Sequence, residues 1–162
     1  MSEINISSKD NLFENGVANI KNVLENNNLE SILGWKLKQI YDEDISLPET
    51  PSVAVLFDSS RMQLREASNL TRRRYTYNLR YSIWYYHSEL DANFRHKEIT
   101  WRMWQLANIL NVNVTLNGFV PSLGSEVEVV RFRPRMTYGG VIMASALIEL
   151  VAKKLCTIEA IL

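Results

Sequence analysis

Cysteine and histidine are the scarcest functional residues in this sequence, and both shortages exclude a class of site. The 162 residues contain one cysteine, Cys156, so no internal disulfide can form. The two histidines, His87 and His96, lack the cysteine or Glu-x-x-His spacing that would complete a tetrahedral metal site. We therefore expect no metal centre.

Long apolar runs are also missing. No stretch approaches about eighteen uninterrupted apolar residues, which predicts that no transmembrane helix is present. The first residues, MSEINISSKD, lack the basic region and apolar core of a secretory signal. These features favour a soluble protein that is assembled in the cytoplasm and does not bind a membrane.

Glycine-based nucleotide and hydrolase motifs are absent. The sequence has no Gly-x-Ser-x-Gly elbow. Neither a phosphate loop nor a dinucleotide fingerprint is formed by the glycines of the second half, Gly118, Gly124, Gly139 and Gly140. A pair of carboxylates brought together by folding stays open as a catalytic arrangement. We expect no enzyme activity, no catalytic residues and no cofactor.

Charge of either sign is not in excess. Eighteen basic and eighteen acidic residues cancel, which argues against a protein that binds polyanions over its whole surface. The signs are separated locally, with acids near residue 43 and arginines near residues 73 and 133. This pattern suits head-to-tail packing of identical subunits, although a solvated surface is the commoner explanation. The predicted interface residues are Arg72, Arg73, Arg74, Arg80, Arg131, Arg133, Arg135, Asp42, Glu43 and Asp44.

The stretch RRRYTYNLRYSIWYYH, residues 72–87, combines four arginines with six aromatic residues and has no acid. Its alternate residues are apolar and polar, which is the period of a β-strand. We expect Tyr77, Leu79, Tyr81 and Ile83 to face the core, and Thr76, Asn78, Arg80 and Ser82 to face outward. Arginines on an overlong strand favour contacts with another protein, while the same composition also suits nucleic-acid binding through phosphates and stacked bases.

Two helices are predicted from the spacing of apolar residues. Residues 12–26 place Phe13, Val17, Ile20 and Leu24 on one face. A second helix, from Glu89 to Leu110, begins after Ser88 and Asp91, which have the spacing of a capping box. We expect it to pack Phe94, Trp101 and Trp104 against the sheet.

The remaining segments are shorter or ambiguous. Residues 27–50 are predicted to be a loop with apolar anchors such as Leu33, Trp35 and Ile40, and residues 58–72 a polar connection. Val53 to Phe57 form a short apolar run typical of a buried strand. SEVEVVRFRPR, from Ser125, alternates until a slip at Val130 that indicates a β-bulge. Residues 141–155 fit either a helix or a strand that aligns Ala144, Ala146, Ile148, Leu150 and Ala152.

The order of these elements resembles bacteriophage tail terminator proteins of the lambda-like and contractile-tail kind. The resemblance covers roughly residues 10–155 and rests on element order rather than on a short motif. The matching segments are the first helix, PSVAVLF, RRRYTYNLRYSIWYY, DANFRHKEITWRMWQLANIL, SEVEVVRFR and VIMASALIELVAKK. The resemblance implies an α+β fold, a small single-domain sandwich with a mostly antiparallel β-sheet packed by helices. Residues 51–162 would form the core, with residues 1–50 packed on it as an extension, and the final segment would be a strand.

The resemblance also implies a function. Tail terminators form a homo-oligomeric ring, a hexamer in the family, which stops tube polymerisation and provides the docking surface for the head. The implied partners are the tail tube protein, a neck or connector protein and, in contractile tails, the sheath. DNA would be only passing cargo in the channel, and the protein would reside in the virion. A neck or head-completion protein and a nucleic-acid-binding module remain the alternatives.

Overall fold

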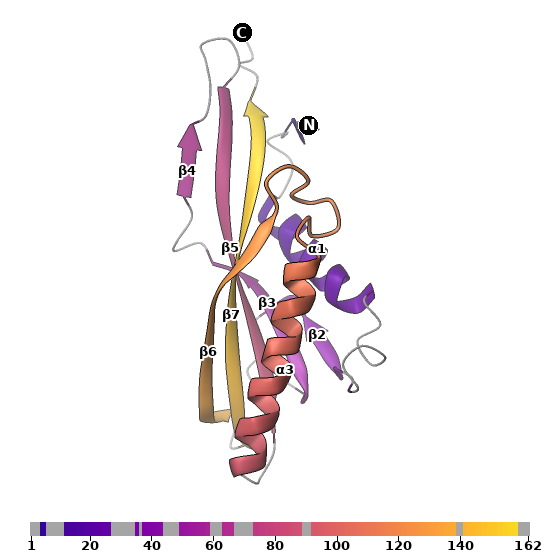
Figure 1. The fold of residues 1–162 in the computed structure, drawn as a ribbon, viewed down its shortest axis with the longest axis vertical. Coiled ribbons are helices and arrows are strands. Elements are labelled where there is room, and N and C mark those ends of the chain that lie inside the picture. The colour runs from indigo at the N-terminus through magenta and orange to yellow at the C-terminus, as the bar shows by residue number, and fades with distance from the viewer. Residues whose placement is uncertain are drawn as a thin grey trace.

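A mostly antiparallel sheet of seven strands, covered by two helices, makes up the described part of the chain (Figure 1). The computed structural model describes residues 4–5, 12–26, 35, 37–43, 49–58, 63–66, 73–88, 92–138 and 141–158. The fold is therefore α+β, as predicted. Its elements are β1 (Ile4–Asn5), α1 (Leu12–Asn26), β2 (Gln39–Tyr41), β3 (Ser52–Phe57), β4 (Gln63–Glu66), β5 (Arg73–His87), α3 (Ala92–Val112), β6 (Ser125–Tyr138) and β7 (Val141–Ile158).

Two unusually long strands form the centre of the sheet. β5 has 15 residues and β7 has 18, and they pair antiparallel from Arg73↔Ile158 to His87↔Ala144. On its other side, β5 pairs first with β4 and, farther along, with β3. In the same way, β7 pairs first with β6 and, farther along, with β1. The part of β5 and β7 beside β4 extends beyond both helices (Figure 1). In the helix-covered part the strand order is β6–β7–β5–β3–β2.

The alternation predicted for β5 is confirmed. Leu79, Tyr81 and Ile83 are buried, while Tyr77 is half-buried at the end of the same face. Side chains on the opposite face, from Thr76 to Ser82, are half-buried rather than fully exposed. The strand thus separates an aromatic core face from a polar face, but its central position keeps even the polar face partly covered.

The ambiguous final segment is a strand, β7. Paired residues share a face of the sheet, so Leu150 joins Tyr81 and Ile148 joins Ile83 on the core side. The whole predicted row is buried: Ala144, Ala146, Ile148, Leu150 and Ala152. The long partner β5 decides the choice, because a helix over these residues would leave the backbone of β5 without its ladder.

Helix α1 packs on the sheet through Val17, Ile20 and Leu24, as predicted. Its approach depends on Gly16, where an added Cβ would lie 1.8 Å from the hydroxyl oxygen of Tyr81. Glycine is therefore required sterically at this helical position. Phe13, at the start of the helix, is partly exposed and stacks on Phe57 of β3 with ring centroids 4.4 Å apart.

Helix α3 packs through a stripe of four residues, Ile99, Met103, Leu106 and Leu110, all of which are buried. The prediction that the two helix tryptophans face the sheet is wrong. Trp101 and Trp104 are 54% and 58% exposed. The stripe follows helical spacing from Ile99, and the tryptophans fall outside it. The predicted cap at Asp91 and the side chain of Phe94 lie outside the described residues.

Three short strands were not predicted. β2 lies in the expected loop of residues 27–50, β4 in the expected polar connection, and β1 near the start of the chain. Strands of two to four residues are too short to show alternation. The predicted bulge is present one or two residues earlier than expected, since the β6–β7 register shifts between Val127 and Val129. Trp35 and Ile40 anchor the loop against the core, and Leu33 lies outside the described residues.

Candidate functional site

The predicted interface arginines lie in separate parts of the sheet. Arg73 pairs with Ile158 at one end of β7, whereas Arg131 of β6 pairs with Leu147, eleven residues away along β7 or about 36 Å. The fold therefore does not bring the two arginine groups together. Arg133 and Arg135 lie on β6 with Arg131, and Arg74 follows Arg73 on β5. Arg131 is exposed, the side chains of the others lie outside the described part, and so does all of Arg72.

Arg80 is engaged within the chain. Its guanidinium forms an ion pair with Glu128 of β6, and it spans the intervening strand β7 on the polar face of the sheet. Lys153 of β7 pairs with Glu126 at 3.4 Å on the same face. These pairs neutralise the charges of the polar face locally, which leaves Arg80 less available to a partner than the sequence suggested.

The acidic residues lie at the opposite edge of the sheet from β6. Asp42 and Glu43 directly follow β2 and are exposed. Glu49 is nearby, because its backbone N–H donates to the hydroxyl of Tyr41 at 3.2 Å. Asp42 also lies 3.9 Å from the ammonium group of Lys21, whereas Asp44 is outside the described residues. With four strand spacings between β2 and β6, the two edges are about 19 Å apart.

The exposed tryptophans of α3 are the strongest interaction feature that sequence reasoning missed. Trp101 and Trp104 stack on each other with ring centroids 5.4 Å apart and an interplanar angle of 21°. Two large aromatic side chains in water are unusual on an isolated surface and are enriched at protein interfaces. A strict i, i+4, i+7, i+11 spacing from Ile99 would have separated them from the buried stripe.

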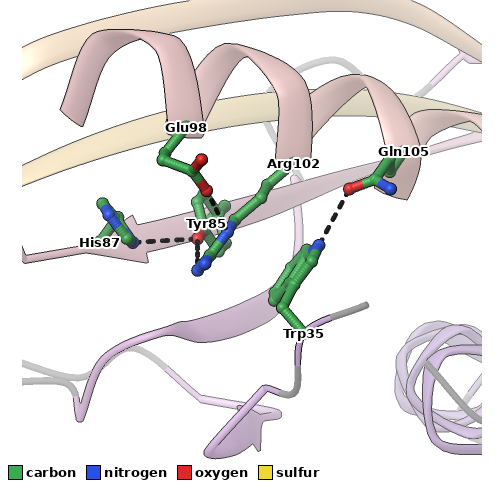
Figure 2. A network of polar contacts seen from close by, with 6 residues as sticks. All are labelled: Trp35, Tyr85, His87, Glu98, Arg102 and Gln105. Atoms are coloured by element: carbon green, nitrogen blue, oxygen red, sulfur yellow. Dashed lines mark hydrogen bonds and ion pairs between the residues drawn. The ribbon is translucent and has the colours of Figure 1, made fainter. Parts of the chain in front are cut away.

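A polar network connects helix α3 with two segments that lie beneath it, the segment before β2 and the end of β5 (Figure 2). The Trp35 indole donates to the side-chain oxygen of Gln105 at 2.9 Å. Arg102 donates to the hydroxyl of Tyr85 at 3.2 Å and to Glu98 at 3.1 Å, and its guanidinium carbon lies 4.6 Å from the centroid of the Trp35 ring. The network clamps the segment before β2, the end of β5 and helix α3 together.

Tyr85 is the centre of this network. Its hydroxyl lies 3.2 Å from Nδ1 of His87 as well as from Arg102. Burial raises the pKa of Tyr85 to about 12, although the hydrogen bond and charge of Arg102 act in the opposite direction. The phenol therefore stays protonated at neutral pH and keeps its hydroxyl hydrogen available to the network.

A buried lysine fixes the connection between α3 and β6. Lys154 of β7 donates to the backbone carbonyl of Phe119 at 2.6 Å, and its ammonium group lies 4.1 Å from the centroid of the Phe119 ring. The ring and the carbonyl partly replace the water that the charge loses. Sequence reasoning assigned no role to this residue.

Among the residues that the structure describes, no group of three or more histidine, cysteine, aspartate or glutamate side chains could hold a metal ion. Neither described helix is long and apolar enough to cross a membrane. No protein-family model matches the chain, and no curated protein is significantly similar to it.

Proposed function

We propose that this protein is a structural subunit that assembles head to tail into a ring and caps the end of a phage tail tube. The observation that carries the proposal is the opposite charge of the two outer edges of one sheet. Exposed Arg131 lies on β6, whereas exposed Glu43 and Glu49 lie beside β2. A surface that complements a different surface of an identical chain produces rings or filaments rather than closed pairs.

The specific role, tail termination, rests on the resemblance of the element order to tail terminators. The α+β fold and the extended final strand β7 agree with the architecture that this family implies. A ring of this kind ends tube growth and offers its other side to a neck or connector protein. Its location would be the virion, with DNA passing through the ring.

The buried aromatic residues of β5 favour this role over a nucleic-acid surface. Tyr81 and Tyr85 are at most 1% exposed, so neither can serve as a platform for a base. Arg80 is paired with Glu128 instead of being free for phosphate. Tyr81, Tyr85 and Arg80 of the stretch that suggested nucleic-acid binding are thus used inside the chain.

Electron microscopy of the purified protein tests the assembly directly, and a ring with a central hole is the expected image. Phage particles that lack the protein should carry tubes of abnormal length that do not join heads. Binding assays with purified tail tubes and with portal-side components then separate a terminator, which binds tubes, from a neck protein. A monomer that binds DNA tightly at physiological salt, with normal tails formed in its absence, would refute the proposal.

A further inference from the structure

An exposed apolar strip follows the junction of α3 and β6. We define it by four residues, Trp101 and Trp104 of the helix and Val130 and Phe132 of the strand. The strand residues are each 38% exposed, and the tryptophans are exposed by more than half. Clustered large apolar side chains at a surface are typical of a contact with another protein, and tryptophan is enriched among the residues that contribute most of its binding energy.

The helix residues and the strand residues of the strip lie at the same height along the junction of α3 and β6. The side-chain oxygen of Asn111 accepts a hydrogen bond from the backbone N–H of Val127 at 3.3 Å, which marks where α3 and β6 meet. Counting seven residues back along the helix reaches Trp104, and counting three residues on along the strand reaches Val130, about 10 Å in each case. Seven residues are two helical turns, so Trp104 lies on the same side of α3 as Asn111. Val130 pairs with buried Ile148 and thus lies on the helix-covered side of the sheet.

The strand that carries half of the strip is an outer strand. Among the described strands, β6 pairs with β7 alone. Val130, Arg131 and Phe132 are consecutive and all exposed, so both faces of β6 are open here. An outer strand with an apolar face next to an exposed aromatic pair is suited to accept an edge of another protein.

The charges beside the apolar strip indicate which surface docks on it. Lys97 lies one turn before Trp101, and Arg131 lies between the two strand residues of the strip; both are exposed and make no ion pair among the described residues. The β2 edge carries Glu43 and Glu49, which are also exposed and have no ion pair there. Lys38 offsets one of these charges, so the edge is weakly acidic.

We propose that the apolar strip is the surface on which a second copy of this chain docks with its β2 edge. The inference rests on the proposed ring and names the two surfaces that form it. Every copy has one strip and one β2 edge, at opposite sides of its sheet. A contact uses the strip of one copy and the β2 edge of the next, so the second surface of each copy stays available for a further copy. Repetition closes the ring when the rotation between neighbours divides a full turn.

The aromatic half is tested by the double variant Trp101→Ser/Trp104→Ser. Multi-angle light scattering should show assemblies of the unaltered chain, and the variant should dissociate toward the 18.7 kDa monomer with at least about tenfold weaker association. Val112→Ser is the matched control, since Val112 is an 80% exposed apolar residue of the same helix outside the strip. Circular dichroism should show both variants folded.

The charge complementarity between the strip and the β2 edge is tested by mixing two variants, neither of which should assemble alone. Lys97→Glu/Arg131→Glu makes both surfaces acidic, and Glu43→Lys/Glu49→Lys makes both basic, so neither chain should assemble alone. In an equimolar mixture the acidic strip faces a basic edge and the basic strip faces an acidic edge. The mixture should therefore restore assemblies that contain both chains in equal amounts.

The outcomes separate this inference from the proposed function. If the unaltered chain forms rings and the serine variant forms them equally well, or if mixing restores nothing, the docking surfaces are wrong while the ring stands. If the unaltered chain stays monomeric at all concentrations and tails form normally without it, the proposed function fails. A monomeric chain whose serine variant loses binding to purified tail tubes would show that the tube protein occupies the strip, which overturns the second copy as its partner.

Discussion

Two buried tyrosines on the same face of β5 differ in the partners of their hydroxyl groups. The hydroxyl of Tyr81 is buried, has no hydrogen-bond partner among the residues that the structure describes, and faces Gly16 of α1. The hydroxyl of Tyr85 lies within hydrogen-bonding distance of Arg102 and His87. The same residue type is therefore a packing element at one position and the centre of a polar network at the other.

Replacing each tyrosine with phenylalanine should distinguish these roles. Tyr81→Phe removes an unsatisfied polar atom, so the free energy of unfolding should stay the same or rise slightly. Tyr85→Phe leaves Arg102 without one partner and should lower it by about 1 to 3 kcal/mol. Urea denaturation of the two variants measures the difference, and equal losses at both positions would contradict it.

Gly16→Ala should destabilise the chain even though alanine is the better helix former. The added methyl group would overlap the Tyr81 side chain, for a loss of about 3 kcal/mol against a propensity gain of about 1 kcal/mol. A net loss of about 2 kcal/mol is expected from urea denaturation. Asn22→Ala, at an exposed position of the same helix, should be neutral or slightly stabilising. A stabilised Gly16→Ala variant would mean that α1 packs farther from the sheet.

At the scale of elements, the orientation of α3 determines both the core and the candidate interface. The buried stripe from Ile99 to Leu110 faces the sheet, Arg102 and Gln105 face the segment around Trp35, and the tryptophan pair faces solvent. The network of Figure 2 fixes the rotation of the helix, because its hydrogen bonds require Arg102 and Gln105 on that side. The exposed position of Trp101 and Trp104 follows from this rotation.

The orientation predicts unequal costs along the helix. Leu106→Ala should lower the free energy of unfolding by about 2 to 5 kcal/mol, as truncations of buried leucine do. Trp104→Ala should lower it by less than about 1 kcal/mol, because its side chain is mostly in water. Both are best measured in the Lys97→Glu/Arg131→Glu background, so that loss of assembly does not contribute. The reverse order would show that the tryptophans face the core.

The whole molecule is organised around the pairing of β5 with β7, to which both helices and the remaining strands attach directly or through a neighbour. Tyr81 and Tyr85, on the core face of β5, are therefore buried at the centre of the fold. Burial raises the pKa of Tyr81 above its ordinary value and raises that of Tyr85 to about 12. The folded state thus holds both phenols in their neutral form well into alkaline pH.

The stability of the whole chain should consequently fall at high pH. Below pH 10, the ordinary pKa of an unfolded tyrosine, both states keep the protons and the stability is fully present. Above pH 10 the unfolded chain ionises first, so the free energy of unfolding declines as the pH rises toward 12. Tyr81→Phe/Tyr85→Phe should flatten the decline in urea denaturation curves recorded between pH 9 and 12. An unchanged slope would show that other groups cause it.

Local sequence patterns were sufficient to predict β5, α1 and β3. Alternation in β5 and helical spacing in α1 each record a difference in burial between two faces, the apolar run of β3 records a strand that is buried on both faces over most of its length, and these elements form as predicted. The α+β class and the separation of acidic from basic residues could be read in the same way. These properties depend on neighbours in sequence or on the sum of such patterns.

Other properties were decided by residues that are distant in sequence. The strand conformation of β7 depends on the length of β5, and β1, β2 and β4 exist because longer strands offer them a ladder. The side of α3 that faces water depends on Trp35, 70 positions before Gln105. Burial of Lys154 depends on Phe119, and the placement of opposite charges at opposite edges depends on strand order. Burial and pairing energies belong to contacts across the folded chain, so only the tertiary structure determines them.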